Sequence, residues 1–207
     1  MAYNGGITFN FVIKLNDNTV GSLTQKQKSL IIGTVLGDGY LRIIPKRKNA
    51  FLEINHSAKQ KDYVDWKYEI LKLIVKSKPK LRNGNGNRVA YRFFTQCIPE
   101  ITNLFTCFYK DGKKIIPENL VINELSLAVW FMDDGSNSGG SIYLNTQQFS
   151  EDDQRKLQNL LANQYNIRSN LNKDKIYKRI RIITEDARKF CDLVRQYIPK
   201  SMEYKLV

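Results

Sequence analysis

The chain has 207 residues, and its 33 Lys and Arg residues outnumber its 20 Asp and Glu residues, which gives a net charge of +13. The length allows one sizeable domain or two small domains that share a core, and the basic charge, spread along the chain, favours a nucleic-acid partner over a membrane surface. One histidine and three cysteines without paired spacing argue against a zinc centre, and no apolar run is long enough to span a bilayer.

The first helix is predicted to begin at a capping box. Thr24 and Gln27 have the spacing of this motif, so we expect a helix from there to Gly37. Its C-terminal part reads I-I-G-T-V-L-G-D-G over residues 31–39. Gly33 and Gly37 lie four residues apart on one face of this helix, where they would let another backbone approach closely.

Two hairpins and two helices are predicted after the first helix. Their expected positions are a hairpin at residues 40–57, an amphipathic helix at 60–76, a second hairpin at 78–95 and a short helix at 97–109. In the first hairpin, Leu52 and Ile54 alternate with polar residues, so one face of the sheet is expected to pack on a core.

The order of elements begins again with a second apolar helix. The sequence L-A-V-W-F-M-D-D-G at residues 127–135 echoes the first motif, and Asn123 is expected to cap its helix. A glycine-rich turn at residues 138–140, a strand, a helix beginning at Ser150, another hairpin and a last helix follow. Each half is therefore predicted to read helix, hairpin, helix, hairpin, helix. We therefore predict an α+β fold with an internal repeat. The predicted parts are an N-terminal extension at residues 1–23, with a candidate strand at 7–15, a first repeat at 24–116 and a second repeat at 117–207.

Both motifs end in an acid followed by a glycine. Asp38 and Asp134 stand at helix C-termini, where the partial negative charge of the helix disfavours a carboxylate. One such acid alone would be interpreted as an exposed residue at a frayed helix end. If the two apolar helices pack together, however, both acids emerge side by side, and their crowded oxygens suit a hard cation such as Mg²⁺. We therefore predict a divalent metal site at the seam between the two halves.

The polar faces of the predicted hairpins are rich in Arg, Lys, Asn, Gln and Tyr. A two-stranded ribbon fits the major groove of DNA, where Arg and Lys address guanine and Asn or Gln addresses adenine. A solvated sheet face is the alternative interpretation for any one strand, but four such hairpins on a basic chain favour DNA. The candidate DNA-binding residues are Arg42, Lys46, Arg47, Lys48, Glu53, Asn55, Arg82, Arg88, Arg92, Tyr143, Asn145, Arg168, Asn170, Asn172, Tyr177, Arg179 and Arg181.

These motifs resemble those of the LAGLIDADG homing endonucleases, especially the single-chain, intron-encoded members with two motif copies. The resemblance rests on I-I-G-T-V-L-G-D-G-Y, on K-K-I-I-P-E-N-L ahead of L-S-L-A-V-W-F-M-D-D-G, and on Y-L-N-T-Q-Q-F-S-E. It implies tandem pseudo-twofold αββαββα repeats whose antiparallel sheets form a saddle over duplex DNA, with the motif helices between them. One departure is that Val129 and Trp130 replace small residues expected near the close crossing of these helices.

By motif position, the resemblance makes Asp38 and Asp134 the metal-binding acids, with the carbonyls of Gly37 and Asp133 as further ligands. The Asp133 side chain receives no separate catalytic role. The implied cofactor is Mg²⁺ or Mn²⁺, and Ca²⁺ is expected to bind without supporting cleavage.

Three further positions match active-site residues of the family. Lys114 and Lys205 match lysines that steady charge on the scissile phosphate or tune the attacking water. Gln147 matches a position that orders active-site water, for which the first half offers His56 or Ser57 instead.

The resemblance implies site-specific double-strand cleavage across the minor groove with short 3′ overhangs, by metal-assisted hydrolysis without a nucleophilic side chain. The expected partner is double-stranded DNA with a long, partly asymmetric site, bound by a monomer. The main alternative is an intron RNA maturase that binds its own intron and cuts no DNA, and a silent DNA-binding regulator is a third possibility. The excess of Lys over Arg, with abundant Ile and Asn, hints at an A+T-rich organellar genome, in a mitochondrion or chloroplast.

Overall fold

The computed structural model describes residues 23–84 and 87–206. The first half contains α1 (Gln25–Leu36), β1 (Tyr40–Ile43), β2 (Ala50–Ser57), α2 (Lys61–Leu71), β3 (Lys80–Asn83), β4 (Val89–Phe94) and α3 (Pro99–Phe108). The second contains α4 (Glu124–Asp134), β7 (Gly135–Ser138), β8 (Ser141–Leu144), α5 (Glu151–Tyr165), β9 (Ser169–Asp174), β10 (Tyr177–Ile182) and α6 (Thr184–Arg195). The predicted order of helix, hairpin, helix, hairpin, helix is confirmed in both halves. The candidate strand at residues 7–15 lies outside the described residues.

Short elements complete the described chain. They are the 3₁₀ helices η1 (Ala58–Gln60), η2 (Lys72–Ile74) and η3 (Lys200–Lys205), and the two-stranded ribbon of β5 (Tyr109–Lys110) and β6 (Lys113–Lys114). The ribbon leads from α3 towards the second motif helix. No helix in the part of the chain that the structure describes is long and apolar enough to cross a membrane.

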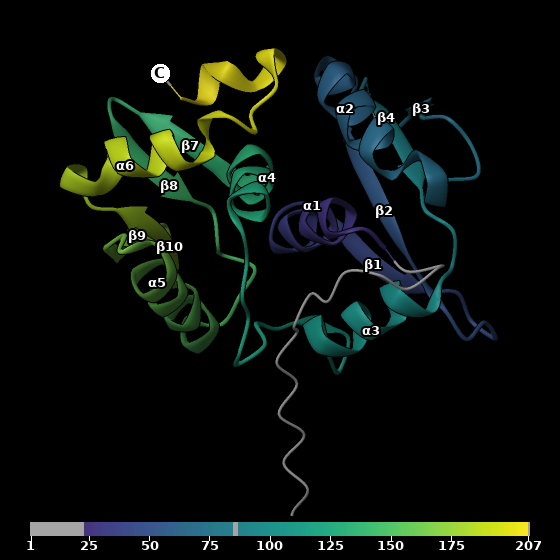
Figure 1. The fold of residues 1–207 in the computed structure, drawn as a ribbon, viewed down its shortest axis with the longest axis horizontal. Coiled ribbons are helices and arrows are strands. Elements are labelled where there is room, and N and C mark those ends of the chain that lie inside the picture. Colours follow the sequence, from purple (N-terminus) through teal and green to yellow (C-terminus); the bar gives the residue numbers. More distant parts are fainter. Residues whose placement is uncertain (1–22, 85–86, 207) are drawn as a thin grey trace, which may run out of the picture.

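Each half has a four-stranded antiparallel sheet with the same topology. The strand orders are β1-β2-β4-β3 and β7-β8-β10-β9. In each sheet the apolar residues point to one side. Leu52 and Ile54 in the first sheet are fully buried, as predicted, and so are Ile180 and Ile182 in the second. Figure 1 shows the two sheets on opposite sides of α1 and α4, which pack against each other at the centre of the molecule.

The N-termini of the two central helices are fixed by side-chain caps, as predicted. The backbone amide of Gln27 donates to Thr24 Oγ1 at 3.2 Å, and the backbone amide of Thr24 donates to Gln27 Oε1 at 3.0 Å. The capping box is therefore complete. Asn123 accepts from the Ser126 amide at 3.0 Å and also donates to Ser29 Oγ at 2.7 Å. The cap of α4 therefore also joins it to α1.

The glycines of α1 allow the close approach of α4. A Cβ on Gly33 would lie 2.4 Å from the Ser126 carbonyl oxygen and 2.7 Å from Val129 Cβ, and one on Gly37 would lie 2.4 Å from Asp133 Cβ. A close helix contact requires only one of the two facing side chains to be missing. For this reason α4 can carry Val129 where the family motif leads one to expect a small residue.

We expect Gly33→Ala to destabilise the protein by ~1–3 kcal/mol, because the added methyl overpacks the crossing. Alanine normally favours a helix over glycine by about 1 kcal/mol, so a loss of stability would identify the crossing as its cause. Urea unfolding measures the change. Lys26→Ala, on the exposed side of the same helix, is the control and should change stability by less than ~0.5 kcal/mol. A Gly33→Ala protein as stable as the wild type would contradict the tight packing described above.

Candidate active site at the crossing of the two motif helices

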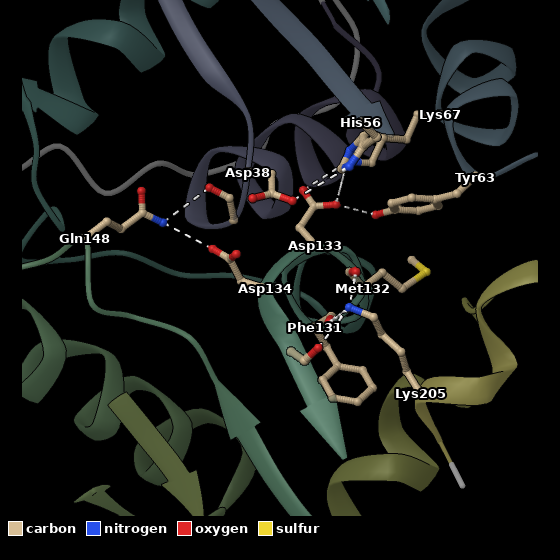
Figure 2. Close-up of polar contacts among 12 residues, drawn as sticks. Asp38, His56, Tyr63, Lys67, Phe131, Met132, Asp133, Asp134, Gln148 and Lys205 are labelled. Carbon is tan, nitrogen blue, oxygen red and sulfur yellow. Dashed lines mark hydrogen bonds and ion pairs between the residues drawn. The ribbon is translucent and has the colours of Figure 1, made fainter. Parts of the chain in front are cut away.

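The two motif acids meet where α1 and α4 end. Asp134 is the last residue of α4, and Asp38 follows Gly37, the residue that ends α1. Figure 2 shows the two carboxyl groups close together at the crossing. Burial raises the pKa of Asp134 to about 8, with a further contribution from the charge of Asp38, and burial also raises the pKa of Asp38. The nearby charge of Asp133 adds to the upward shift of both pKa values, as expected for like charges in a partly desolvated place.

Each of the two predicted lysines contacts the C-terminal end of one motif helix. Lys114, on β6, donates to the Gly37 carbonyl at 2.9 Å. Lys205, on η3, donates to the carbonyls of Met132 and Gly135, the latter at 2.8 Å. Burial lowers the pKa of Lys114 to about 8 and lowers the pKa of Lys205. These ammonium groups offset the negative ends of both helices, which makes two carboxylates tolerable there.

The glutamine that contacts the acids is Gln148 rather than Gln147. Gln148 Nε2 donates to Asp134 Oδ2 at 3.2 Å and to the Gly37 carbonyl at 3.3 Å. Gln147 Nε2 donates instead to Asp174 Oδ2 at 2.7 Å. The prediction for Gln147 differs from the structure because β8 ends at Leu144, so a turn, and not strand alternation, decides which amide faces the site.

The first half brings His56 to the acids. The imidazole is buried, with Nδ1 3.7 Å from Asp38 Oδ2 and Nε2 3.7 Å from Asp133 Oδ1. Burial lowers the pKa of His56 to about 4, so the ring is neutral at neutral pH. Ser57, the other candidate, is exposed and accepts a hydrogen bond from the Lys59 amide.

The side chain of Asp133 points toward α2 of the first half and lies near Asp38, since both carboxylates face the His56 ring (Figure 2). It is fully buried and accepts hydrogen bonds from Lys67 Nζ at 2.7 and 2.9 Å and from the Tyr63 hydroxyl at 2.7 Å. Lys67 and Tyr63, on α2, were not predicted as site residues. One feature of the sequence could have indicated that Lys67 is buried. It lies on the same helix face as Val64 and Leu71, where an apolar residue is expected.

The donors at the crossing suit a hard divalent cation. Among the described residues, no group of three or more His, Cys, Asp or Glu side chains could hold a metal ion. Mg²⁺, however, is usually bound by one or two carboxylates together with oxygens of the substrate. Asp38 and Asp134 provide such a pair, and the Gly37 carbonyl lies beside it within reach of Lys114 and Gln148.

In the first sheet, the predicted DNA-binding residues share the exposed face. Strand register places Asn55 opposite Arg92, and Tyr40 opposite Glu53, so these side chains point the same way. Glu53 forms ion pairs with Arg42 at 3.1 Å and with Arg92 at 3.8 Å. The remaining predicted residues of this half are exposed, on β3 or in hairpin loops: Arg82, Arg88, Lys46, Arg47 and Lys48.

The second sheet has a corresponding polar face. Register places Arg179 opposite Asn172, Arg181 opposite Asn170 and Arg181 opposite Tyr143, and the exposed Tyr177 lies at the start of the same strand. Arg179 donates to Asn145 Oδ1 at 3.2 Å and lies over the Tyr143 ring, 4.2 Å from its centroid.

Arg168 differs from the other predicted DNA-binding residues. Its guanidinium forms a bidentate ion pair with Asp186 in the first turn of α6, with both distances 3.0 Å, and its amide donates to the same carboxylate. This pair ties the start of β9 to α6, so the structure directs Arg168 to a helix rather than to the open face of the sheet. The arginine side chain stays largely exposed.

Comparison with known proteins identifies the class. The chain matches the model of the LAGLIDADG DNA endonuclease family over residues 28–190. It therefore belongs to this family, and its α+β architecture is the fold of LAGLIDADG homing endonucleases.

Several relatives are similar over most of the chain. The probable intron-encoded endonuclease 1 of Wickerhamomyces canadensis is 32% identical over 200 residues, which cover 90% of this chain and 86% of that protein. The structure of the homing endonuclease I-WcaI bound to its DNA recognition sequence matches with a TM-score of 0.84 at 29% identity, covering 94% and 96% of the two chains.

Two other relatives are longer proteins. RecA of Mycobacterium gastri is 32% identical over 205 residues, or 89% of this chain, and the chain spans 48% of its length. The cytochrome b mRNA maturase bI2 of Saccharomyces cerevisiae is 29% identical over 213 residues, which cover 92% of this chain and 49% of the maturase.

The neighbouring acids Asp133 and Asp134 are expected to respond to substitution in opposite ways. Between pH 3.8 and about 8, Asp134 holds a proton in the folded protein and releases it in the unfolded chain. This carboxyl therefore lowers the free energy of unfolding progressively as pH rises through that range. In metal-free buffer Asp134→Asn should therefore raise the melting temperature, by an amount that grows over this range and levels off above it. Asp133→Asn should destabilise by ~3–5 kcal/mol, because Lys67 loses its buried partner. Thermal unfolding of both variants measures this, and shifts of the same sign would contradict the assigned environments.

Proposed function

We propose that the chain is a site-specific endonuclease that hydrolyses both strands of a duplex DNA target and leaves short 3′ overhangs. The observation that carries the proposal is the meeting of Asp38 and Asp134 between two sheets whose exposed faces are polar and basic. The I-WcaI structure, a homing endonuclease bound to its recognition sequence, supports the same assignment by its similarity over nearly the whole chain.

In the proposed mechanism, Asp38 and Asp134 would hold a divalent cation, with the Gly37 and Asp133 carbonyls as further oxygen donors. Such a cation, Mg²⁺ or Mn²⁺ and not Ca²⁺, would polarise the scissile phosphate and make water more acidic. The protein needs no nucleophilic side chain for this chemistry.

Three polar side chains around the acids have complementary roles in this proposal. Lys114 and Lys205 place ammonium groups where negative charge grows on the phosphate and on the leaving 3′ oxygen. The pKa of Lys114, which burial lowers to about 8, also suits this lysine to exchange protons near neutral pH. Gln148 donates its amide to Asp134 and so fixes the direction of that carboxylate.

Cleavage of a randomised duplex library in Mg²⁺, followed by sequencing of the ends, tests the proposed activity and reveals the target. We expect breaks at one sequence with 3′ overhangs, and we expect Asp134→Ala to lower the cleavage rate by about 100-fold or more while binding persists. Asp152→Ala, an exposed acid on α5, removes the same charge away from the site and should cut like the wild type. Equal cleavage by Asp134→Ala and the wild type would overturn the proposal.

Sequence recognition is proposed to rest on the exposed faces of the sheets. Arg179 is held in place by Asn145 and Tyr143, and both of these partners are neutral, so its charge is free for a guanine or a phosphate. We expect Arg179→Ala to weaken binding of the identified target by ~1–3 kcal/mol and to relax selectivity at one base pair. Arg188→Ala removes the same charge from the exposed side of α6 and is the matched control. Fluorescence anisotropy at one fixed salt concentration measures both, and equal losses would show that net charge alone matters.

A second candidate function is intron RNA maturation. The observation that favours it is the similarity to the yeast cytochrome b mRNA maturase. A pure RNA or DNA binder has no need of the paired acids, so alanine at Asp38 or Asp134 would leave its activity unchanged. A protein that binds its own intron RNA but leaves the intronless DNA sequence uncut would establish the maturase or a silent regulator instead.

The oligomeric state and the cellular origin of the protein are also proposals. We propose that it acts as a monomer, because the two repeats already pair their motif helices within one chain. An organellar origin is supported by the composition and by the relative named for cytochrome b mRNA, whereas the mycobacterial RecA relatives show that related sequences also occur in bacterial proteins.

A further inference from the structure

We propose that His56 is the positioning residue of Asp38 and that a buried cluster of Tyr63, Lys67 and Asp133 holds it in place. The two acids of the site are then supported by different groups, His56 for Asp38 and Gln148 for Asp134. The consequence for catalysis rests on the proposed nuclease function, whereas the positioning itself is a property of the folded chain.

The cluster is rigid because it is buried and fully paired. The side chains of Lys67 and Asp133 have no exposed surface, and Tyr63 is buried as well. Asp133 accepts two hydrogen bonds from Lys67 and one from Tyr63, which satisfies the charges that burial would otherwise penalise. Because Lys67 and Tyr63 lie on α2 and Asp133 lies on α4, the cluster also connects the two halves of the molecule (Figure 2).

The cluster fixes which nitrogen of His56 faces Asp38. Lys67 Nζ lies 3.4 Å from His56 Nε2, and an ammonium group can only donate, so Nε2 is the acceptor. The ring proton is then on Nδ1, the nitrogen 3.7 Å from Asp38 Oδ2. The imidazole also packs on the Tyr63 ring, with 5.4 Å between the centroids. The N–H of His56 is thus aimed at a carboxylate that is itself half exposed.

Among the described residues, no equivalent cluster lies behind Asp134. The residue that corresponds to Asp133 in the first motif is Gly37, which carries no side chain. The single lysine of α5, the counterpart of α2, is Lys156, which is partly exposed and pairs with Glu118 and Asp153. Asp134 is instead contacted by Gln148 from the turn between β8 and α5. Loss of His56 should therefore disturb Asp38 and leave Asp134 in place.

This difference predicts that the two strand cleavages depend unequally on His56. If Asp38 is misplaced, cleavage of the strand that depends more on Asp38 becomes slower, while cleavage of the other strand continues. A loss of general stability would slow both strands together. The ratio of the two strand rates therefore separates a positioning role from a merely structural one.

The test combines strand-resolved, single-turnover cleavage of the identified target with crystal structures of the free proteins. His56→Ala is expected to slow one strand by about 10-fold to 100-fold relative to the other, the usual effect of removing a group that orients a ligand, so nicked DNA accumulates. His56→Gln supplies an amide donor like that of Gln148 and should restore much of the wild-type ratio. Gln148→Ala is the matched variant and should bias the ratio towards the opposite strand.

A second variant guards against misfolding. Lys67→Met combined with Asp133→Leu replaces the ion pair by apolar side chains, which proteins often tolerate, yet it removes the donor that orients His56. This variant is expected to show the same strand bias as His56→Ala.

Crystal structures give a readout that does not require cleavage. In His56→Ala we expect the Asp38 carboxylate to leave its wild-type position while Asp134 keeps its contact with Gln148. An unmoved Asp38, or equal slowing of both strands, would overturn the inference. A wild-type protein that cuts neither strand would remove the proposed function, and the position of Asp38 in the two crystal structures would still decide the inference.

Discussion

The close crossing of α1 and α4 is the contact on which the rest of the molecule depends. Gly33 and Gly37 remove the side chains that would hold the helices apart, and the crossing then places Asp38 and Asp134 together at one end. This arrangement is unfavourable by itself, since two carboxylates share a desolvated place with the negative ends of two helices. Lys114 and Lys205 offset part of that cost by binding the terminal carbonyls. A divalent cation bound between the two carboxylates, as proposed above, would offset the rest.

The two halves share a topology but differ in chemistry. The residue just before the motif acid is Gly37 in the first motif and Asp133 in the second. Only Asp133 has a side chain to bury. Burying a carboxylate requires a counter-charge, which explains a fully buried lysine on α2. The same ion pair then brings His56 against Asp38, whereas Asp134 is contacted by an amide from a turn. One local substitution in a duplicated motif thereby makes the surroundings of the two acids unequal.

The exposed faces of the two sheets also differ, in how far their positive charge is neutralised. Glu53 pairs with Arg42 and Arg92 in the first sheet, so part of the positive charge of that sheet is neutralised within the protein. Among the described residues, the partners of Arg179 and Arg181 in the second sheet are neutral, namely Asn145 and Tyr143 for Arg179 and Ser141 for Arg181. Two faces with unlike charge are suited to the unlike halves of an asymmetric partner, and the rigid crossing fixes the distance between them.

The sequence by itself determined the repeat, the helix caps and the faces of the strands. Local hydrogen bonds set the caps at Thr24 and Asn123, and alternation within strands sets burial at Ile180 and Ile182, so neighbouring residues carry this information. Tertiary structure alone decided that Gln148 rather than Gln147 reaches the acids, that Arg168 pairs with Asp186, and that Lys67 lies beneath Asp133. These outcomes depend on where a strand ends and on which distant element fills the space beside it. Residue spacing places Lys67 on the buried face of its helix, but it does not identify the partner, which is set only when the two halves pack together.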